Sequence, residues 1–340
     1  MKSDAGRMSE THKTMTSRHP MWLLSPLYLL LSLCATSSAN DGALDRWQTQ
    51  RMEAPQVSSD GVWTDVIIDG QWRIQRHVIF GYLRLLDPEE RRLCFGDMQQ
   101  CYSELERWRA CGAIAPAPQH VVICLHGWRG SRASMQELSQ VLTEQGGLNV
   151  INFGYASTHG TIQEHVYALE SVVRNLKGVR RVSFVAHSLG NIVVRHLLYK
   201  LEVQHNPPPI AFERMVMLAP PNHGAELADT VAHRRLLRLM LGETVYQLAP
   251  QAAWPTLEMQ LAVPDFEFGI ISGGRGNEEG YLPRLPGDDD GLLSVETQRL
   301  DGSTAFLQVG GLHQFLPRYP AVQAATLSFL LSGQFANERL

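Results

Sequence analysis

The sequence lacks the features of a nucleic-acid-binding protein and of a zinc protein. It has no basic block, and 30 Lys and Arg stand against 34 Asp and Glu, which gives a net charge of −4. A nucleic-acid-binding surface needs a local excess of positive charge, so we expect no such partner. The five cysteines include no Cys-x-x-Cys spacing, so we expect no structural zinc.

The first 39 residues lack an apolar run long enough to cross a bilayer as a helix. Residues 21–33 are apolar but too few, and they include Pro26. Basic residues precede this run and the small residues Ser37, Ser38 and Ala39 follow it, as in a secretory signal peptide. We therefore expect residues 1–39 to be a signal peptide, or alternatively a membrane anchor, and the protein to be exported to the periplasm or secreted.

Export would permit disulfides among the cysteines that follow residue 39. Cys101 and Cys111 fall on one predicted helix, about 15 Å apart at the helical rise, so they should not pair with each other. Cys124 lies in a predicted central strand and is expected to be a buried thiol. The sequence leaves the pairing of the remaining thiols, including Cys94, open.

Residues 40–118 are predicted to form a polar linker, a hairpin and a helix. The strands are expected at 62–68 and 72–79, joined by a tight turn at Asp69-Gly70. The helix is expected over 97–111, with Asp97 as its N-cap.

From residue 120 onward, apolar strands alternate with amphipathic helices. Such a pattern is typical of an α/β protein with a mostly parallel central sheet and helices on both faces. Capping boxes are expected at Ser134 and at Thr161, each with a glutamate three residues later. The expected strands are 121–125, 150–153, 182–185, 215–218, 268–271 and 306–309, and the expected helices are 134–145, 161–177, 191–201 and 320–331.

The most informative segment is Ala186-His187-Ser188-Leu189-Gly190, between an apolar strand and a helix. A serine at such a turn, with small residues two positions before and after it, is typical of a nucleophile elbow. The small neighbours matter because the turn is sharp, and a larger side chain at 186 or 190 would clash. Ser188 is therefore the candidate nucleophile.

A serine hydroxyl needs a base, and thirteen histidines compete for this role. The chain order serine, acid, histidine points to His313, which follows the last strand in a glycine-rich loop. A base also needs a carboxylate to orient it, for which Asp290 is preferred over Asp288 and Asp289. The alternative for this acidic stretch is a solvated loop or a weak cation site.

Two backbone N–H groups are expected to form an oxyanion hole, those of Leu189 and Trp128. Gly127 would let the loop approach the nucleophile, and His126 is expected to hold this loop rather than to act as a base. The Trp128 side chain could form the floor of an acyl pocket or pack against the next helix. His187 is not expected to act as a base.

Residues 225–265 are a candidate lid over the site, because residues 236–241 combine leucines and methionine with nearby arginines. The alternative is a helix packed on the core. His223, which follows a strand end, either lines the cleft or belongs to a structural turn.

Together these motifs resemble the α/β-hydrolase superfamily, and within it the bacterial lipases and esterases. The resemblance covers about 121–331, and alanine at 186 is similar to the variant found in Bacillus lipases. It implies a Ser188–His313–Asp290 triad, an oxyanion hole at Trp128 and Leu189, and no cofactor. Some bacterial lipases bind calcium through an aspartate two residues after the histidine; Phe315 stands there, so no metal site is expected.

The sequence thus predicts an exported serine hydrolase that cleaves carboxylic esters through an acyl-enzyme. The hydrolase domain is expected over 119–340, with a small-molecule or lipid ester as substrate and transient contact with a membrane or lipid interface. The alternatives are an acyltransferase or thioesterase with the same triad, or a non-catalytic lipid-binding protein on a hydrolase scaffold.

Overall fold

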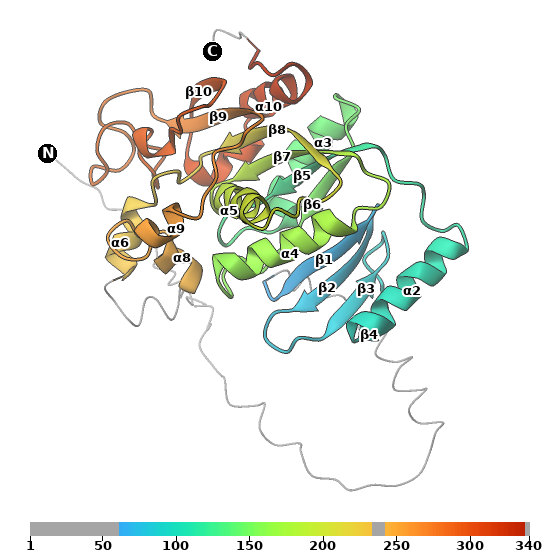
Figure 1. Ribbon diagram of the computed structural model, residues 1–340. Helices are drawn as coiled ribbons and strands as arrows, with labels where there is room; N and C mark the ends of the chain where they lie inside the picture. Colours follow the sequence, from blue (N-terminus) through green and yellow to red (C-terminus); the bar gives the residue numbers. More distant parts are fainter. Residues whose placement is uncertain (1–60, 233–241, 337–340) are drawn as a thin grey trace, which may run out of the picture. The chain divides into compact units, whose positions relative to one another are not determined.

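A computed structural model describes residues 61–232 and 242–336 (Figure 1). The predicted signal segment, the linker up to residue 60 and the leucine-rich residues 233–241 of the candidate lid lie outside the described residues. Within the described part, no helix is both long enough and apolar enough to span a membrane.

A six-stranded sheet forms the centre of the fold, in the order β10-β9-β8-β7-β5-β6. Every adjacent pair in it is parallel. This result confirms the predicted mostly parallel α/β architecture. The strands are β5 (His120–Leu125), β6 (Val150–Phe153), β7 (Arg181–His187), β8 (Ala211–Leu218), β9 (Glu267–Gly274) and β10 (Ala305–Gly310).

Helices cover both faces of this sheet, because the strand side chains alternate between two apolar clusters. Ile123 of β5 packs in one cluster with α4 (Ile162–Asn175) and α5 (Leu189–Val203). Cys124, the next residue, packs in the other cluster with α3 (Gln136–Glu144) and α10 (Pro320–Ser332). Cys124 is fully buried, as predicted.

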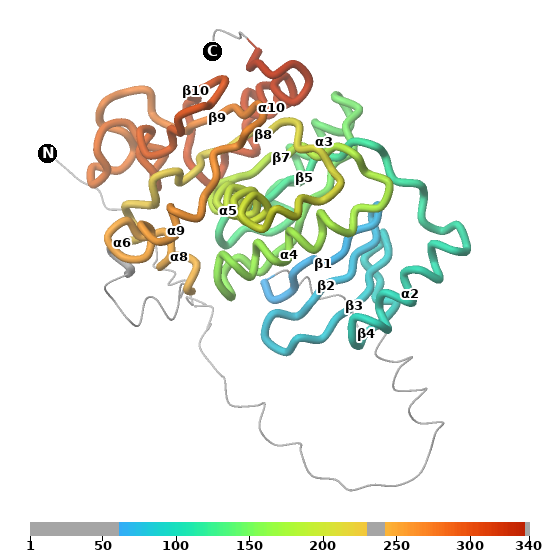
Figure 2. The backbone as a smooth tube through the Cα atoms, in the orientation of Figure 1, coloured from blue at the N-terminus to red at the C-terminus, as the bar shows by residue number. Residues whose placement is uncertain are grey.

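A second sheet precedes the large one and is wholly antiparallel, in the order β1-β2-β3-β4 (Figure 2). The predicted hairpin is present as β1 (Trp63–Asp69) and β2 (Trp72–His77). The short strands β3 (Leu83–Leu86) and β4 (Arg92–Gly96) extend it and were not predicted. The helix α2 (Met98–Ala110) follows, with Asp97 as its N-cap.

The small sheet is tied to the large one by a buried acid. Asp65 of β1 is fully buried; its Oδ2 accepts from Arg73 Nη1 at 2.6 Å and from the Gly154 N–H at 2.7 Å, and its Oδ1 accepts from Gln75 at 2.7 Å. The Asp65 N–H also donates to the Gly154 carbonyl at 2.8 Å. These contacts fix β1 beside the residues that follow β6.

Of the two capping boxes predicted at Ser134 and Thr161, one is correct and one is wrong. Thr161 caps α4 through a capping box with Glu164. Ser134 does not cap α3, because it lies inside a 3₁₀ turn, Arg132–Met135, where its hydroxyl donates to the Ser131 carbonyl at 2.6 Å. The hydroxyl is therefore already used when the α-helix begins at Gln136.

Candidate active site

The predicted nucleophile elbow is a strained turn between β7 and α5. Ser188 has φ 52° and ψ −121°, a conformation that a residue with a Cβ rarely adopts. The surrounding backbone holds it there: the Ser188 N–H donates to the Leu218 carbonyl at 2.9 Å, and the Asn191 amide donates to the Ser188 carbonyl at 3.0 Å. The strain presents the hydroxyl at the carboxyl end of the strand.

Close backbone packing explains the glycines around the elbow. A Cβ on Gly190 would lie 2.8 Å from the Leu125 Cβ and 3.0 Å from the His126 carbonyl oxygen, so α5 could not start so close to β5. A Cβ on Gly127 would lie 2.9 Å from the Ser188 Cβ. The loop after β5 therefore passes directly beside the serine.

The structure brings Ser188, His313 and Asp290 together in one hydrogen-bonded relay. The Ser188 Oγ lies 2.9 Å from His313 Nε2, and His313 Nδ1 lies 2.7 Å from Asp290 Oδ2. With Nδ1–H donating to the carboxylate, Nε2 is free to accept the serine proton. All three residues are buried, and Asp290 is fully so.

Backbone N–H groups distinguish Asp290 from its two acidic neighbours. Asp290 Oδ1 accepts from Leu292 and Leu293 at 3.0 and 2.8 Å, which leaves Oδ2 for the histidine. Asp289 instead accepts from Gly291 at 2.7 Å and from the Leu282 N–H, and Asp288 accepts from the N–H groups of residues 275, 276 and 289. These two neighbours shape the loop and do not contact His313.

His187 and His126 both contact the site's backbone. Burial lowers the pKa of His187 to about 3, so its ring is neutral near pH 7, and its Nε2–H donates to the His313 carbonyl at 3.0 Å. His126 Nδ1 donates to the Gly127 carbonyl at 2.8 Å, while the Tyr155 hydroxyl donates to the His126 carbonyl at 2.6 Å. His187 therefore positions the loop that carries His313, and His126 positions the loop beside Ser188.

The expected oxyanion donors flank the serine. Leu189 is the first residue of α5, so its N–H has no intrahelical acceptor, and the helix dipole favours negative charge there. Neither this N–H nor that of Trp128 bonds to another group in the part of the chain that the structure describes. The Trp128 side chain packs against the core cluster, and the Arg129 guanidinium lies 5.4 Å from its ring centre.

Sequence reasoning missed two polar side chains that support the relay. Gln298 is fully buried and donates from Nε2 to Asp290 Oδ2 at 3.2 Å. Asn222 in turn donates to the Gln298 carbonyl at 2.8 Å. No local pattern marks either residue, because Gln298 reaches the site through a 3₁₀ turn, Glu296–Gln298, and Asn222 through an irregular turn after β8.

The described parts of the candidate lid are three short helices, α6 (Glu226–Ala232), α8 (Glu243–Gln247) and α9 (Trp254–Glu258). Trp254 and Leu257 of α9 and Val245 of α8 are buried in the core cluster, so these parts pack on the body of the protein. The His223 side chain is 53% exposed, and its Nδ1 lies 3.6 Å from a Glu258 carboxylate oxygen. It does not join the relay.

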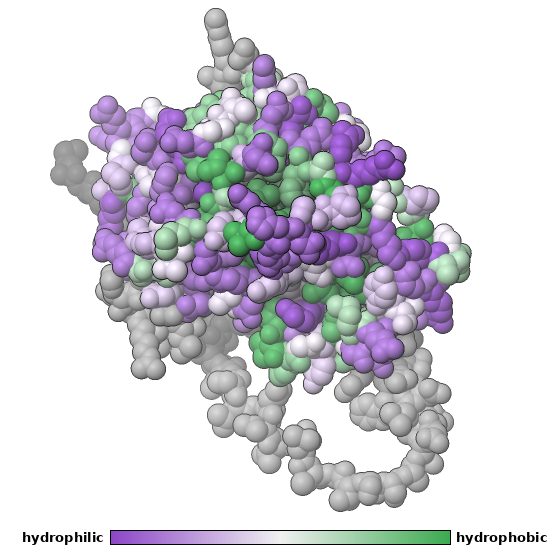
Figure 3. Space-filling model, viewed as in Figure 1, coloured by the Kyte–Doolittle hydropathy of each residue, from purple (hydrophilic) through white to green (hydrophobic). Residues whose placement is uncertain are grey.

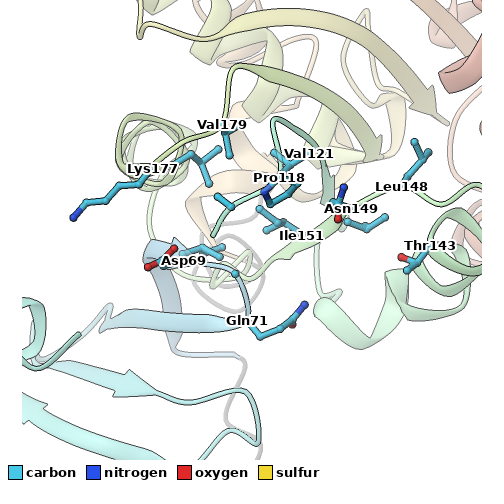
Figure 4. A pocket seen from close by; sticks show the side chains of 15 residues that line it. Asp69, Gln71, Pro118, Val121, Thr143, Leu148, Asn149, Ile151, Lys177 and Val179 are labelled. Carbon is cyan, nitrogen blue, oxygen red and sulfur yellow. The ribbon is translucent and has the colours of Figure 1, made fainter. Parts of the chain in front are cut away.

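A cavity of about 210 Å³ lies away from this site (Figure 4). Val121 and Ile151 line it near the starts of β5 and β6, and Val179 lines it just before β7. Ser188 follows the end of β7, so the cavity opens at the opposite edge of the sheet and is not part of the active site. Among the described residues, no group of three or more His, Cys, Asp or Glu side chains could hold a metal ion.

Comparison with known proteins gives the following similarities. A family model described as a domain of unknown function (DUF7379) matches residues 100–264. No curated protein matches the sequence.

Among solved structures, the chain is similar to the mature lipase BlEst2 of Bacillus licheniformis, with 18% identity over 65% of this chain and 95% of that one and a TM-score of 0.46. It is also similar to the metagenomic carboxyl esterase MGS0156, with 15% identity over 60% and 67% of the two chains and a TM-score of 0.46. For phospholipase PlaB of Legionella pneumophila the values are 22% identity, 53% and 45% coverage, and a TM-score of 0.41.

Proposed function

We propose that the protein is a serine hydrolase that cleaves carboxylic esters through an acyl-enzyme. The observation that carries this proposal is the relay from Ser188 through His313 to Asp290, with contacts of 2.9 and 2.7 Å, on a strained elbow. A merely structural serine would not need a positive φ or a buried histidine and carboxylate aligned behind it.

The geometry supports the following steps. Ser188 Oγ attacks the acyl carbon while its proton passes to His313 Nε2, and Asp290 stabilises the imidazolium that forms. His313 then gives the proton to the leaving alcohol as the ester C–O bond breaks. Water then attacks the acyl-enzyme and gives a proton to His313 Nε2. His313 passes this proton to Ser188 Oγ as the bond between Oγ and the acyl carbon breaks, which releases the carboxylic acid and restores the serine hydroxyl.

The tetrahedral intermediates carry a negative oxygen that needs donors. The N–H groups of Leu189 and Trp128 are the proposed donors, because both flank Ser188 and neither is used elsewhere among the described residues. Donors fixed by the backbone need little reorganisation as the charge develops, and losing one such donor typically costs about 10²- to 10³-fold in kcat.

A fluorophosphonate probe tests the proposal directly. The activated hydroxyl should attack the phosphorus, and mass spectrometry should find one adduct, on Ser188. The matched control is Ser183→Ala, which removes a buried serine hydroxyl within β7, the strand that leads into the elbow, and should leave labelling intact. Absence of label on folded wild-type protein would favour a non-catalytic protein on this scaffold, and a panel of p-nitrophenyl esters would then define acyl-chain preference in the labelled enzyme.

We further propose that the protein is exported, and two thiols provide a test. The Cys94 and Cys101 Sγ atoms lie 3.4 Å apart, between β4 and α2, so a small movement would allow a disulfide. Cys111 is exposed and Cys124 is buried in the sheet, so neither adjoins this pair.

In protein expressed with its own N-terminus and purified without reductant, we expect Cys94 and Cys101 to resist alkylation in denaturant until they are reduced. Cys111 and Cys124 should react at once, and Cys94→Ser should make Cys101 reactive too. Peptide mass spectrometry measures all four. Immediate alkylation of all four thiols would argue against exposure to an oxidising compartment.

A further inference from the structure

An exposed apolar patch lies at one end of the small sheet. It consists of Ile79, Phe80, Tyr82 and Phe95, which are 60, 63, 51 and 47% exposed. In Figure 3 a hydrophobic area lies over the loop that joins β2 and β3, and the first three of these residues belong to this loop. Contiguous exposed apolar side chains usually mark an interaction surface.

The rings of this patch are ordered by contacts with one another. Phe80 and Tyr82 stack with centres 6.0 Å apart, and Tyr82 lies 5.3 Å from Phe95. On the other side Phe80 lies 4.9 Å from His77, whose ring lies 4.9 Å from that of Trp63. The patch is therefore a continuous aromatic row that the fold holds open to solvent.

Arginine accompanies these rings. The Arg84 guanidinium lies 4.1 Å from the centre of the Trp63 ring, and the Arg92 guanidinium lies 5.4 Å from that of Phe95. The continuous segment 72–96 contains five arginines and three acidic residues, Asp87, Glu89 and Glu90. Two of the arginines pair with acids: Arg73 with the buried Asp65, and Arg91 with Asp87 and Glu89. The formal charge of this segment is therefore +2, five minus three, on a protein whose net charge is −4.

The patch lies at the same edge of the fold as Ser188. The Thr64 Oγ1, near the start of β1, accepts from the Ala156 N–H at 3.0 Å, and Ala156 lies just beyond the carboxyl end of β6. His77, at the end of β2, pairs with Trp63 in the antiparallel register, so the loop that follows it lies at this same end. The strands of the large sheet are parallel, so their carboxyl ends lie at one edge of the sheet. Ser188 follows the carboxyl end of β7 and therefore lies at this edge too.

We propose that the aromatic patch docks the protein onto a lipid surface that carries anionic headgroups, with the active-site edge turned toward the lipid. The inference rests on the proposed function and deepens it, because it names aggregated lipid esters as the substrate class. Aromatic rings enter the headgroup region readily, and the neighbouring arginines suit anionic lipid. Aromatic residues and arginine also occur at protein–protein interfaces. We favour a lipid surface because the patch lies at the same edge of the fold as Ser188, where an ester substrate must reach the site, and a protein partner or a second copy of the chain is an outcome that the test separates.

Hydrogen exchange on the full-length protein locates the docked surface. Vesicles of phosphatidylcholine and phosphatidylglycerol are added to the protein, and peptide exchange is compared with and without them. We expect slower exchange over 76–96 in the presence of vesicles, with the effect growing as the phosphatidylglycerol content rises. If vesicles leave hydrogen exchange over 76–96 unchanged, the proposal is overturned. This holds even if the protein binds the vesicles through its N-terminal segment.

Paired variants complete the test. Phe80→Ser with Tyr82→Ser should weaken vesicle binding about tenfold or more, since the apolar area that leaves water is lost. It should slow hydrolysis of a long-chain ester in vesicles, while hydrolysis of a dissolved short-chain ester stays within about twofold of wild type. The matched control is Tyr167→Ser with Leu331→Ser, which removes side chains that are 58 and 55% exposed elsewhere.

The outcomes separate the two proposals. Vesicle binding that depends on the patch, in a protein that hydrolyses no ester, supports the docking surface and contradicts the hydrolase. An equal loss of vesicle binding in both double variants overturns the docking proposal. The proposal is also overturned if light scattering detects a concentration-dependent dimer of the wild type that Phe80→Ser with Tyr82→Ser abolishes.

Discussion

Replacing Ser188 with alanine is expected to lower kcat for a dissolved ester by about 10⁴- to 10⁶-fold. The substitution removes the attacking oxygen and leaves His313 with no proton to accept. Any remaining catalysis would come from the oxyanion donors and from substrate binding, which alone still accelerate hydrolysis over water. The measurement is kcat on a p-nitrophenyl ester, with protein purified from a host that lacks other esterases.

The fold should survive this substitution. Alanine keeps the Cβ, so the backbone strain at φ 52° is unchanged, and the lost hydrogen bond to His313 is worth about 1 kcal/mol. Thermal unfolding should therefore show a Tm within a few degrees of wild type. A variant that retained more than about 1% of the wild-type kcat would remove Ser188 from the mechanism.

The elbow and the order of the site residues could be predicted because local chemistry determines them. The turn at Ser188 needs small residues at 186 and 190, and the structure gives the reason at 190: a Cβ there would lie 2.8 Å from that of Leu125. Parallel strands place their carboxyl ends at one edge, so loops after three different strands could be expected to meet there. The structure brings those loops together.

The choice among three consecutive aspartates could be argued from the sequence but not settled there. All three residues, 288, 289 and 290, are aspartates. They differ only in which backbone N–H groups donate to each carboxylate. In the structure Leu292 and Leu293 hold Asp290, and Gln298 comes from a separate turn to contact the same carboxylate. Such contacts depend on loop conformation, which hydrophobic periodicity does not encode.

The errors in the predicted fold have the same origin. Ser134 satisfies the capping-box pattern, yet its hydroxyl bonds to Ser131 inside a 3₁₀ turn, a choice that depends on how the preceding loop enters the helix. The short strands β3 and β4 have little alternation of their own. They exist because β2 offers a pairing edge and α2 covers one face, so tertiary context decides them.

Replacing Asp290 with asparagine is expected to lower kcat by about 10⁴-fold while the site keeps its shape. The N–H groups of Leu292 and Leu293 donate to Oδ1, so the amide oxygen would take that position. The amide NH₂ would then replace Oδ2 and face His313 Nδ1, which would have to accept. The imidazole proton would move to Nε2, where it would point at Ser188 and prevent proton transfer.

The surroundings of residue 290 can accommodate this amide. Gln298 now donates from Nε2 to Oδ2, and its Oε1 is buried without a partner among the described residues. A flip of the Gln298 amide would turn that oxygen toward the new NH₂ group and satisfy both. The loss should therefore appear in kcat, measured on a dissolved ester, with little change in Tm.

Asp289→Asn is the matched control, because it makes the same chemical change one residue away. Asp289 accepts from the backbone N–H groups of Leu282 and Gly291 and does not contact His313. An amide with its oxygen at the Oδ1 position would still accept from Gly291 and, at 3.2 Å, from Leu282, but its NH₂ group would lie 3.0 Å from the Leu282 nitrogen, where two donors would meet. The cost should be about 1–3 kcal/mol of stability, with kcat changed less than about tenfold. A larger loss of kcat in Asp289→Asn than in Asp290→Asn would show that Asp290 is not the acid of the relay. Only loss of the carboxylate that sets the imidazole tautomer can lower kcat by four orders of magnitude without unfolding the protein.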